Sequence, residues 1–397
     1  DATQGARDGQ LVVCELTQAP DSRRPPIGRI IAVLGDKLTA SLVVETAIHG
    51  HELPFEFPQE VLDEAASVPL VVEPAMIGDR VDLRSMPLVT IDGEDAKDFD
   101  DAVYCEPNAD GFRLVVAIAD VSNYVRPGTP LDEEAQKRAT SVYFPGFVVP
   151  MLPETLSNGI CSLMPKVDRM CFVCDMQIDR DGLVTHSRFY EAVMNSHARL
   201  TYTQVWKAVG EDDADTKAWM GDLLPQVQRL HQLYKVLSKA RAKRGAIEFE
   251  SSEVRFVLDN RGEVTQAGML VRNDAHKLIE ECMIAANVEA AKYLLSRHVP
   301  APYRIHEKPP ETKYADLLEF LKEFKLSLPP WSKVRPGDYT KLLKKIRDRP
   351  DATLLESVLL RSQSLAIYSP ENHGHFGLAL EAYAHFTSPI RRYADLL

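Results

Sequence analysis

The feature that most constrains this chain is a run of carboxylates enclosed by apolar segments. Six acidic residues occupy the ten positions from Asp92 to Asp101. Apolar residues precede the run at 88–91 and follow it at 102–104, which predicts two strands joined by a buried turn. Each ionised carboxylate raises the cost of ionising its neighbours. A fold that buries this turn therefore needs a cation to neutralise it.

A hard divalent cation meets that need, because it favours the deprotonated form of its ligands. Ligand sets made only of oxygen suit Mg²⁺, with Mn²⁺ as an alternative ion. Magnesium sites of this kind commonly act on phosphate compounds. The carboxylate run therefore predicts a magnesium site that handles a phosphate.

A solvated loop and a calcium loop are the two other interpretations of the run. A charge run is often a solvated loop, but the apolar flanks argue against that here. A calcium loop of the EF-hand type needs a glycine at its sixth position and a glutamate at its twelfth. Counted from Asp98, these positions hold Val103 and Ala109, so the calcium interpretation is disfavoured.

Composition narrows the class of protein only slightly. The net charge is −12, which is the wrong sign for a generic nucleic-acid binder, although a local basic groove can exist on an acidic protein. Residues 1–5 show no signal segment, and no apolar run is long enough to span a membrane. The six cysteines include no second metal-type pair, which fits a reducing compartment. We expect a cytoplasmic protein that does not enter a membrane.

The chain divides into three regions by pattern. Residues 1–45 contain short apolar strands around a turn rich in proline and arginine, which is typical of a small barrel, but they are too few to close one. Residues 46–69 are expected to be a linker between the other two regions and to contain a helix at 59–66. Residues 70–397 mix strands and helices without regular alternation, which favours the α+β class.

Within the larger region, apolar spacing predicts individual elements. Strands are expected at 111–120 and 183–193. Gly245 is expected to end one long helix and Asp274 to cap the next. The last expected helix reaches Leu397 itself, so we expect more chain to follow. The expected helices cover residues 131–139, 216–244, 274–298, 311–325, 338–348, 351–368 and 390–397.

Five segments together resemble the RNB family of exoribonucleases, in the order in which that family has them. The first segment has the family's spacing of four aspartates. The sequences at Ile91–Ala96 and Gly374–Leu380 are more similar to the ribonuclease R branch of the family than to the ribonuclease II branch. The resemblance covers roughly residues 70–397. The segments are Asp92 to Asp101, Thr140–Pro145 with its continuation to Leu163, His197–Tyr202, Leu278–Asn287 and Tyr383–Tyr393.

The resemblance implies an activity and an architecture. Such enzymes degrade single-stranded RNA processively from a free 3′ end, release nucleoside 5′-monophosphates and use Mg²⁺. It implies an RNB catalytic domain at 70–397, with a mixed sheet surrounded by helices, that continues past the last residue here. Residues 1–45 would be the end of a cold-shock barrel of the OB type, and 46–69 a linker. We expect the protein to act as a monomer.

The resemblance also assigns roles to single residues. Asp92, Asp98 and Asp101 match metal ligands, and Asp100 matches the aspartate most needed for catalysis, which also helps to hold a metal or the attacking water. Hydrolysis of a phosphodiester can use two metal ions about 4 Å apart. Arg391 matches a catalytic arginine that would neutralise charge on the scissile phosphate. From the residues alone, a salt bridge from Arg391 to Asp395 is an equal alternative.

Further residues match contacts to RNA. Tyr143 matches an aromatic that stacks on a base, and Phe249 is the candidate for the opposite face of that clamp; a buried core position is the alternative for both. Tyr202 and Glu281 match residues that hydrogen-bond the ribose, with Glu280 as the adjacent alternative. Arg392 is expected to contact the phosphate backbone.

Two other functions remain open at this stage. A catalytically inactive RNA-binding or scaffold protein of the same fold would be indicated by a lost aspartate or arginine, and all five of these residues are present. A magnesium phosphodiesterase acting on DNA or small nucleotides would be separated by comparing RNA and DNA as substrates.

Overall fold

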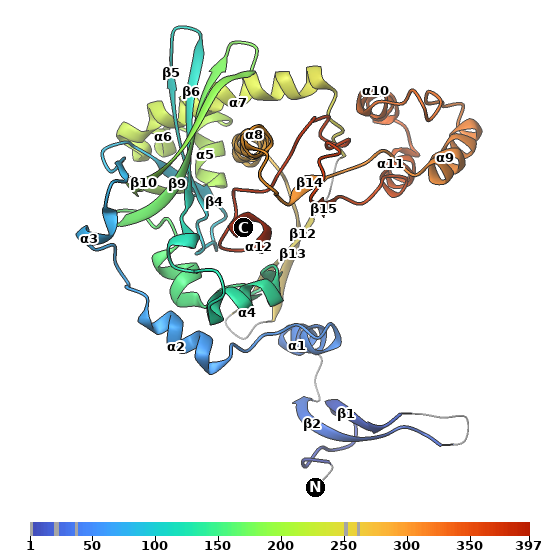
Figure 1. Ribbon diagram of the computed structural model, residues 1–397. Helices are drawn as coiled ribbons and strands as arrows, with labels where there is room; N and C mark the ends of the chain where they lie inside the picture. The colour runs from blue at the N-terminus through green and yellow to red at the C-terminus, as the bar shows by residue number, and fades with distance from the viewer. Residues whose placement is uncertain (1–2, 20–23, 36–38, 250–252, 260–262) are drawn as a thin grey trace.

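A computed structural model describes residues 3–19, 24–35, 39–249, 253–259 and 263–397. Within this part, seven strands form one mixed sheet in the order β11-β4-β5-β6-β9-β10-β3 (Figure 1). The two edge pairs, β11 with β4 and β3 with β10, are parallel, and the other pairs are antiparallel. The strands are β3 (Val81–Asp82), β4 (Val89–Asp92), β5 (Asp101–Pro107), β6 (Gly111–Ala119), β9 (Asp168–Asp179), β10 (Val184–Asn195) and β11 (Ala198–Thr201).

Helices cover both faces of this sheet. On one face, apolar residues such as Leu114 and Val116 of β6 pack with Leu230 and Leu278 in a fully buried core. The helices of that side are α5 (Tyr202–Val209), α6 (Ala214–Met220), α7 (Leu224–Arg244) and α8 (Asp274–Arg297). The opposite core includes residues of α2 (Gln59–Ser67), α4 (Pro130–Arg138) and the short π-helix Thr155–Ile160. The expected α+β class is confirmed.

A separate helical lobe has its own core. Tyr314 and Tyr339 are fully buried between α9 (Glu311–Glu323), α10 (Pro336–Ile346) and α11 (Ala352–Arg361). Figure 1 shows the lobe beside the C-terminal end of α7. Four two-stranded sheets lie outside the main sheet in the described part. They are β1 (Leu11–Gln18) with β2 (Ile27–Gly35), β7 (Val142–Phe144) with β8 (Phe147–Val149), β12 (Glu253–Leu258) with β13 (Val264–Leu270), and β14 (Tyr303–Ile305) with β15 (Ile367–Ser369).

Local chemistry explains where the long helices begin and end. Gly245 adopts a left-handed backbone with φ of 84° and ends α7, as a glycine after a helix commonly does. The expected end of this helix is therefore confirmed. The expected cap of α8 is wrong by one residue, because Asn273, and not Asp274, accepts the backbone N–H of Ala275 with its side chain.

Several expected elements differ in extent. The helix expected at 216–244 is interrupted at Gly221, where φ is 51°, so α6 and α7 are separate. The helix expected at 351–368 ends at Arg361, and Ile367–Ser369 form β15 instead. The helix expected at 390–397 is only α12 (Tyr393–Leu396). Helix α1 (Ala40–Gly50) spans the expected boundary at residues 45 and 46. A further short helix is α3 (Pro74–Ile77).

Across the described residues, no helix combines the length and the apolar character that crossing a membrane requires.

Candidate active site

The carboxylate run lies in the turn between two adjacent strands of the main sheet. Asp92 ends β4 and Asp101 begins β5. Phe99 and Asp100 are buried, with 3% and 4% of their surface exposed, whereas Glu94 and Asp95 are exposed. The inner part of the turn is therefore not a solvated loop. Glu94 and Asp95, which lie outside the four predicted metal ligands, are on the solvent side of the turn.

Asp100 joins the two most distant predicted segments. Its Oδ1 accepts the backbone N–H of Ile390 at 2.8 Å, and its Oδ2 accepts the Nε–H of Arg391 at 3.2 Å. Burial raises the pKa of the Asp100 carboxyl well above its usual range, and the Arg391 charge opposes that rise. A buried carboxylate is thus held beside an arginine 291 positions away along the chain.

Asp395, the alternative partner expected for Arg391, is bound by the next residue, Arg392. Arg392 donates two hydrogen bonds to Asp395, at 2.9 and 2.8 Å, so Asp395 is engaged by Arg392. The side chain of Arg391 remains 46% exposed while its Nε contacts Asp100. Arg391 can therefore reach a ligand at the surface of the site, whereas Arg392 would have to share its guanidinium with Asp395.

The other predicted ligands surround Asp100. Burial raises the pKa of Asp92, and the charge of Asp98 adds to that rise. Burial and the nearby charge of Asp92 raise the pKa of Asp101 to about 7. Asp98 accepts a hydrogen bond from the Tyr143 hydroxyl at 2.6 Å. The four aspartates therefore share one electrostatic neighbourhood.

The chemistry of this donor set fits a divalent cation. Carboxylate oxygens suit a hard ion. Burial and mutual repulsion raise the pKa values of these carboxyls, and a bound cation would lower them again. In the described part of the chain, however, no three side chains of His, Cys, Asp or Glu converge on one metal position. Enclosure of an ion by three of the aspartates would therefore require their side chains to rotate.

A positioning residue that the sequence analysis did not single out is Arg199 on β11. Residues of β11 pair with β4 in parallel, with Arg199 opposite Thr90. The Nη2 of Arg199 donates to the carbonyl oxygen of Gly93 at 2.9 Å and also to that of Glu94. These bonds fix the backbone directly after Asp92. The only sequence signal was the place of Arg199 inside the family segment His197–Tyr202.

We predict that Arg199→Ala weakens Mn²⁺ binding by about 10- to 100-fold, the usual effect of removing a group that orients a metal ligand. The physical reason is the loss of both bonds to the turn that carries Asp92. Isothermal titration with Mn²⁺ measures the affinity. Arg180→Ala is the matched control, because Arg180 also donates to a backbone carbonyl, that of Ala109. Equal affinities in the two variants would contradict the assignment.

Tyr202 lies beside the carboxylates. It follows Thr201, which is opposite Asp92 in the β11–β4 register and caps α5 through a reciprocal pair of bonds with Gln204. The Tyr202 ring stacks on His276, with ring centroids 4.2 Å apart. Burial, followed by the charges of Asp92 and Asp101, raises the pKa of the Tyr202 hydroxyl. The structure therefore brings Tyr202 to the predicted metal site.

Glu281 and Phe249 line a small pocket next to this region. The pocket has a volume of about 120 Å³. Glu281 is buried and accepts a hydrogen bond from Arg241 Nη1 at 2.7 Å. Glu280, the adjacent alternative, contacts Arg241 and Arg272. Both carboxylates are thus already paired with arginines, and burial raises the pKa of Glu281.

The rings of Tyr143 and Phe249, the two residues predicted to clamp a base, are not in contact in the described part of the chain. Tyr143 lies on β7 with 50% of its surface exposed, which leaves a ring face available for stacking. Phe249 packs against the core of the helical lobe. No ring contact recorded between described residues joins Tyr143 to Phe249. The pairing of these two rings around a base stays a prediction.

Family models match two regions of the chain. Residues 80–397 match the RNB domain, and residues 1–58 match the cold shock domain. Because the first match covers most of the chain, the chain belongs to the RNB domain family.

Its relatives include enzymes named ribonuclease R. Ribonuclease R of Escherichia coli strain K12 is 53% identical over 397 residues, which cover 100% of this chain and 49% of that relative. Ribonuclease R of Thermotoga maritima is 44% identical over 400 residues, which cover 99% of this chain and 56% of the relative. The chain thus spans about half the length of the curated relatives it matches.

Solved structures similar to this chain agree on the fold. Mycoplasma genitalium RNase R in complex with ribose methylated single-stranded RNA matches with a TM-score of 0.91 and 29% identity, over 99% of this chain and 61% of that one. Yeast Ssd1, described as a pseudonuclease, matches with a TM-score of 0.72 and 19% identity, over 98% of this chain and 48% of its own. The second likeness concerns the fold alone.

Proposed function

We propose that this chain is the catalytic part of a 3′→5′ exoribonuclease. It would hydrolyse single-stranded RNA processively to nucleoside 5′-monophosphates with Mg²⁺, or with Mn²⁺ in its place. The observation that carries the proposal is the buried Asp100 paired with the half-exposed Arg391 at 3.2 Å. The ribonuclease R relatives and the RNA named in the Mycoplasma genitalium complex support this choice of substrate.

The chain's own residues have distinct tasks in this proposal. Asp92, Asp98, Asp100 and Asp101 would hold the divalent cations, which when bound supply an activated water and neutralise phosphate charge. Arg391 would place its exposed guanidinium on the scissile phosphate, where preorganised charge stabilises the transition state. Arg392 has a smaller part, as a contact to the phosphate backbone, because Asp395 already binds it.

Binding of the 3′ end would use the aromatic and ribose-facing groups. Tyr143, with Phe249 opposite, would stack on bases, which is worth about 1–3 kcal/mol per base and tolerates any sequence. Tyr202 and Glu281 would contact the sugar, since the 2′-hydroxyl distinguishes RNA from DNA. We also retain the expected domains at 1–45, 46–69 and 70–397, and the expected monomer, as proposals.

The proposal is tested with matched RNA and DNA oligomers that carry a free 3′-hydroxyl. We expect Mg²⁺-dependent release of mononucleotides from RNA and little from DNA, with no release in EDTA and none when the 3′ end is blocked. Equal or faster digestion of DNA would replace the proposal with a general phosphodiesterase. Binding of RNA without any cleavage would indicate an inactive scaffold.

Sugar selectivity gives a sharper prediction at one residue. Tyr202→Phe should lower the preference for RNA over DNA by about tenfold, because a site built to hydrogen-bond a hydroxyl discriminates through that bond. The measurement is the ratio of kcat/KM values for the matched oligomers. Tyr190→Phe is the control, because the Tyr190 hydroxyl bonds Asp175 on β9. An unchanged ratio in Tyr202→Phe would remove Tyr202 from sugar recognition.

A further inference from the structure

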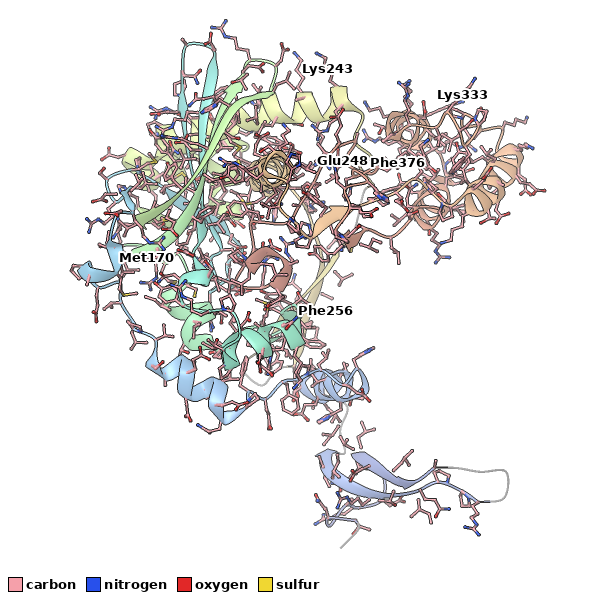
Figure 2. The ribbon with its side chains drawn as sticks, viewed as in Figure 1. Met170, Lys243, Glu248, Phe256, Lys333 and Phe376 are labelled. Atoms are coloured by element: carbon pink, nitrogen blue, oxygen red, sulfur yellow. The ribbon has the colours of Figure 1, made fainter. Side chains whose placement is uncertain are left out.

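A large cavity lies away from the carboxylate turn, between the main sheet's helices and the helical lobe. Its volume is about 1170 Å³. It is lined by the end of α7, by Arg335 and one side of α10 as far as Lys344, by residues 306–308, and by residues 372–376 and 379–381. Figure 2 labels Lys243 near the end of α7 and Phe376 nearer the helical lobe, and both residues line the cavity. The cavity is therefore formed by segments far apart in the sequence.

The charge of the lining is unlike that of the whole chain. Six of its residues are lysine or arginine and three are acidic, in a chain of net charge −12. Two of the acids are engaged: Glu307 contacts His373, and Asp338 accepts the backbone N–H of Arg335. The six cationic residues are Lys243, Arg244, Lys308, Arg335, Lys341 and Lys344.

None of these six cations has a carboxylate partner among the described residues, because no ion pair of the described part of the chain engages any of them. Like charges grouped in a concave site repel one another, and the site concentrates their field on any anion that enters. The cavity therefore favours a ligand with several negative charges.

Contacts between separate segments hold the walls of the cavity. A Cβ atom at Gly245 would lie 3.0 Å from the Cα of Gly337, so the end of α7 and the start of α10 touch through two glycines. The Thr340 hydroxyl donates to the carbonyl of Ala246 at 3.0 Å, and Arg244 Nε donates to that of Leu378 at 3.0 Å. Lys341 and Lys344 are three residues apart on α10, so they share one helix face. The cations are thus presented by fixed elements.

The end of α7 also connects the cavity to the candidate active site. Arg241 bonds Glu281 in the small pocket, and Arg244, one helical turn later, lines the large cavity. The charge of Glu281 also acts on Arg244. The large cavity is therefore a neighbour of the predicted ribose contact.

We propose that this cation-lined cavity is a second binding site for phosphate groups, separate from the carboxylate site. Choosing RNA as their source depends on the proposed function. Phosphodiesters of an RNA strand and the phosphate of a released nucleoside monophosphate share the chemistry that this lining recognises. Lysine ammonium groups contact both as point charges, without reading the base.

The test uses the double variant Lys341→Gln/Lys344→Gln in the Asp100→Asn background, so that RNA is bound without being cut. The matched control is Lys333→Gln/Lys345→Gln, which removes the same charge from the same lobe outside the cavity lining; Figure 2 labels Lys333 there. Binding of single-stranded RNA is measured across salt concentrations, and binding of uridine 5′-monophosphate is measured separately. Circular dichroism verifies that both variants fold.

If RNA occupies the cavity, the double variant binds RNA more weakly and the slope of log K against log salt becomes shallower by about 1.4, or roughly 0.7 for each lost phosphate contact, while the control stays at the parent value. If the free nucleotide occupies it, only nucleotide binding falls. RNA and nucleotide binding equal to those of the control overturn the proposal. Cleavage by the unmodified chain reports independently on the proposed function, so the two failures are distinguishable.

Discussion

Asp100→Asn is expected to reduce RNA cleavage by at least about 10³-fold, at the upper end of what removal of one preorganised electrostatic group costs. The variant replaces the carboxyl group that accepts hydrogen bonds from Arg391 and from the backbone N–H of Ile390, and with it the negative charge that a bound cation would favour. RNA binding is expected to persist, because the amide keeps the shape of the side chain and can still accept from Ile390. Single-turnover cleavage and equilibrium binding of the same labelled RNA measure the two effects.

The control for this prediction is Asp95→Asn, in the same turn. Asp95 is exposed and does not match the family's spacing of aspartates, so its variant should cleave at close to the parent rate. Cleavage by Asp100→Asn at a similar rate would remove Asp100 from the chemistry. Loss of cleavage and binding together, with loss of the folded circular dichroism signal, would instead show that the Asp100 contacts are structural.

Short sequence patterns correctly predicted the strands beside the carboxylate run and the end of the long helix α7. The apolar flanks of the carboxylate run became β4 and β5, and the helix stop at Gly245 is explained by its left-handed backbone. Helix α1 was missed because its sequence contains the β-branched residues Val43 and Val44, which favour strands. A helix forms there with Thr39 as its cap, since the Thr39 side chain accepts the N–H of Leu42.

Elements that depend on distant partners could not be found in this way. Ile367–Ser369 continue an apolar helical pattern, yet they form β15 because β14 lies beside them, with Ile305 opposite Ile367. The three residues are too few for a periodicity to separate helix from strand. The break at Gly221 was also missed, because the apolar spacing typical of a helix continues from α6 across Gly221 into α7.

For the candidate site, sequence indicated which residues take part but not how they are paired. The resemblance selected Asp100 and Arg391, and the fold brings them into contact. It could not show that Arg392 takes Asp395, because both arginines lie within reach of that carboxylate. Nor could it show that Arg199 binds the carbonyls of the turn, since backbone acceptors leave no trace in a sequence.

The raised pKa of Asp101 predicts how stability depends on pH without divalent ions. Burial and the charge of Asp92 raise the pKa of Asp101 to about 7 in the folded chain, whereas the ordinary pKa of an aspartate is 3.8. Between these two values the unfolded chain ionises and the folded chain does not, so this residue makes the free energy of unfolding fall as pH rises. The loss is about 4 kcal/mol over that range, at about 1.4 kcal/mol per pH unit.

Asp101→Asn removes this dependence and isolates it from the other titrating groups. In EDTA, the variant should gain up to about 4 kcal/mol relative to the parent between pH 4 and pH 7, measured by urea denaturation. Adding Mn²⁺ at pH 7 to 100 times its dissociation constant should stabilise the parent by about 2.7 kcal/mol and the variant by much less. The difference in free energy of unfolding between the parent and Asp101→Asn should change from pH 4 to pH 7. A constant difference would show that Asp101 is not held protonated. Equal stabilisation of both by Mn²⁺ would show that Asp101 is not a ligand.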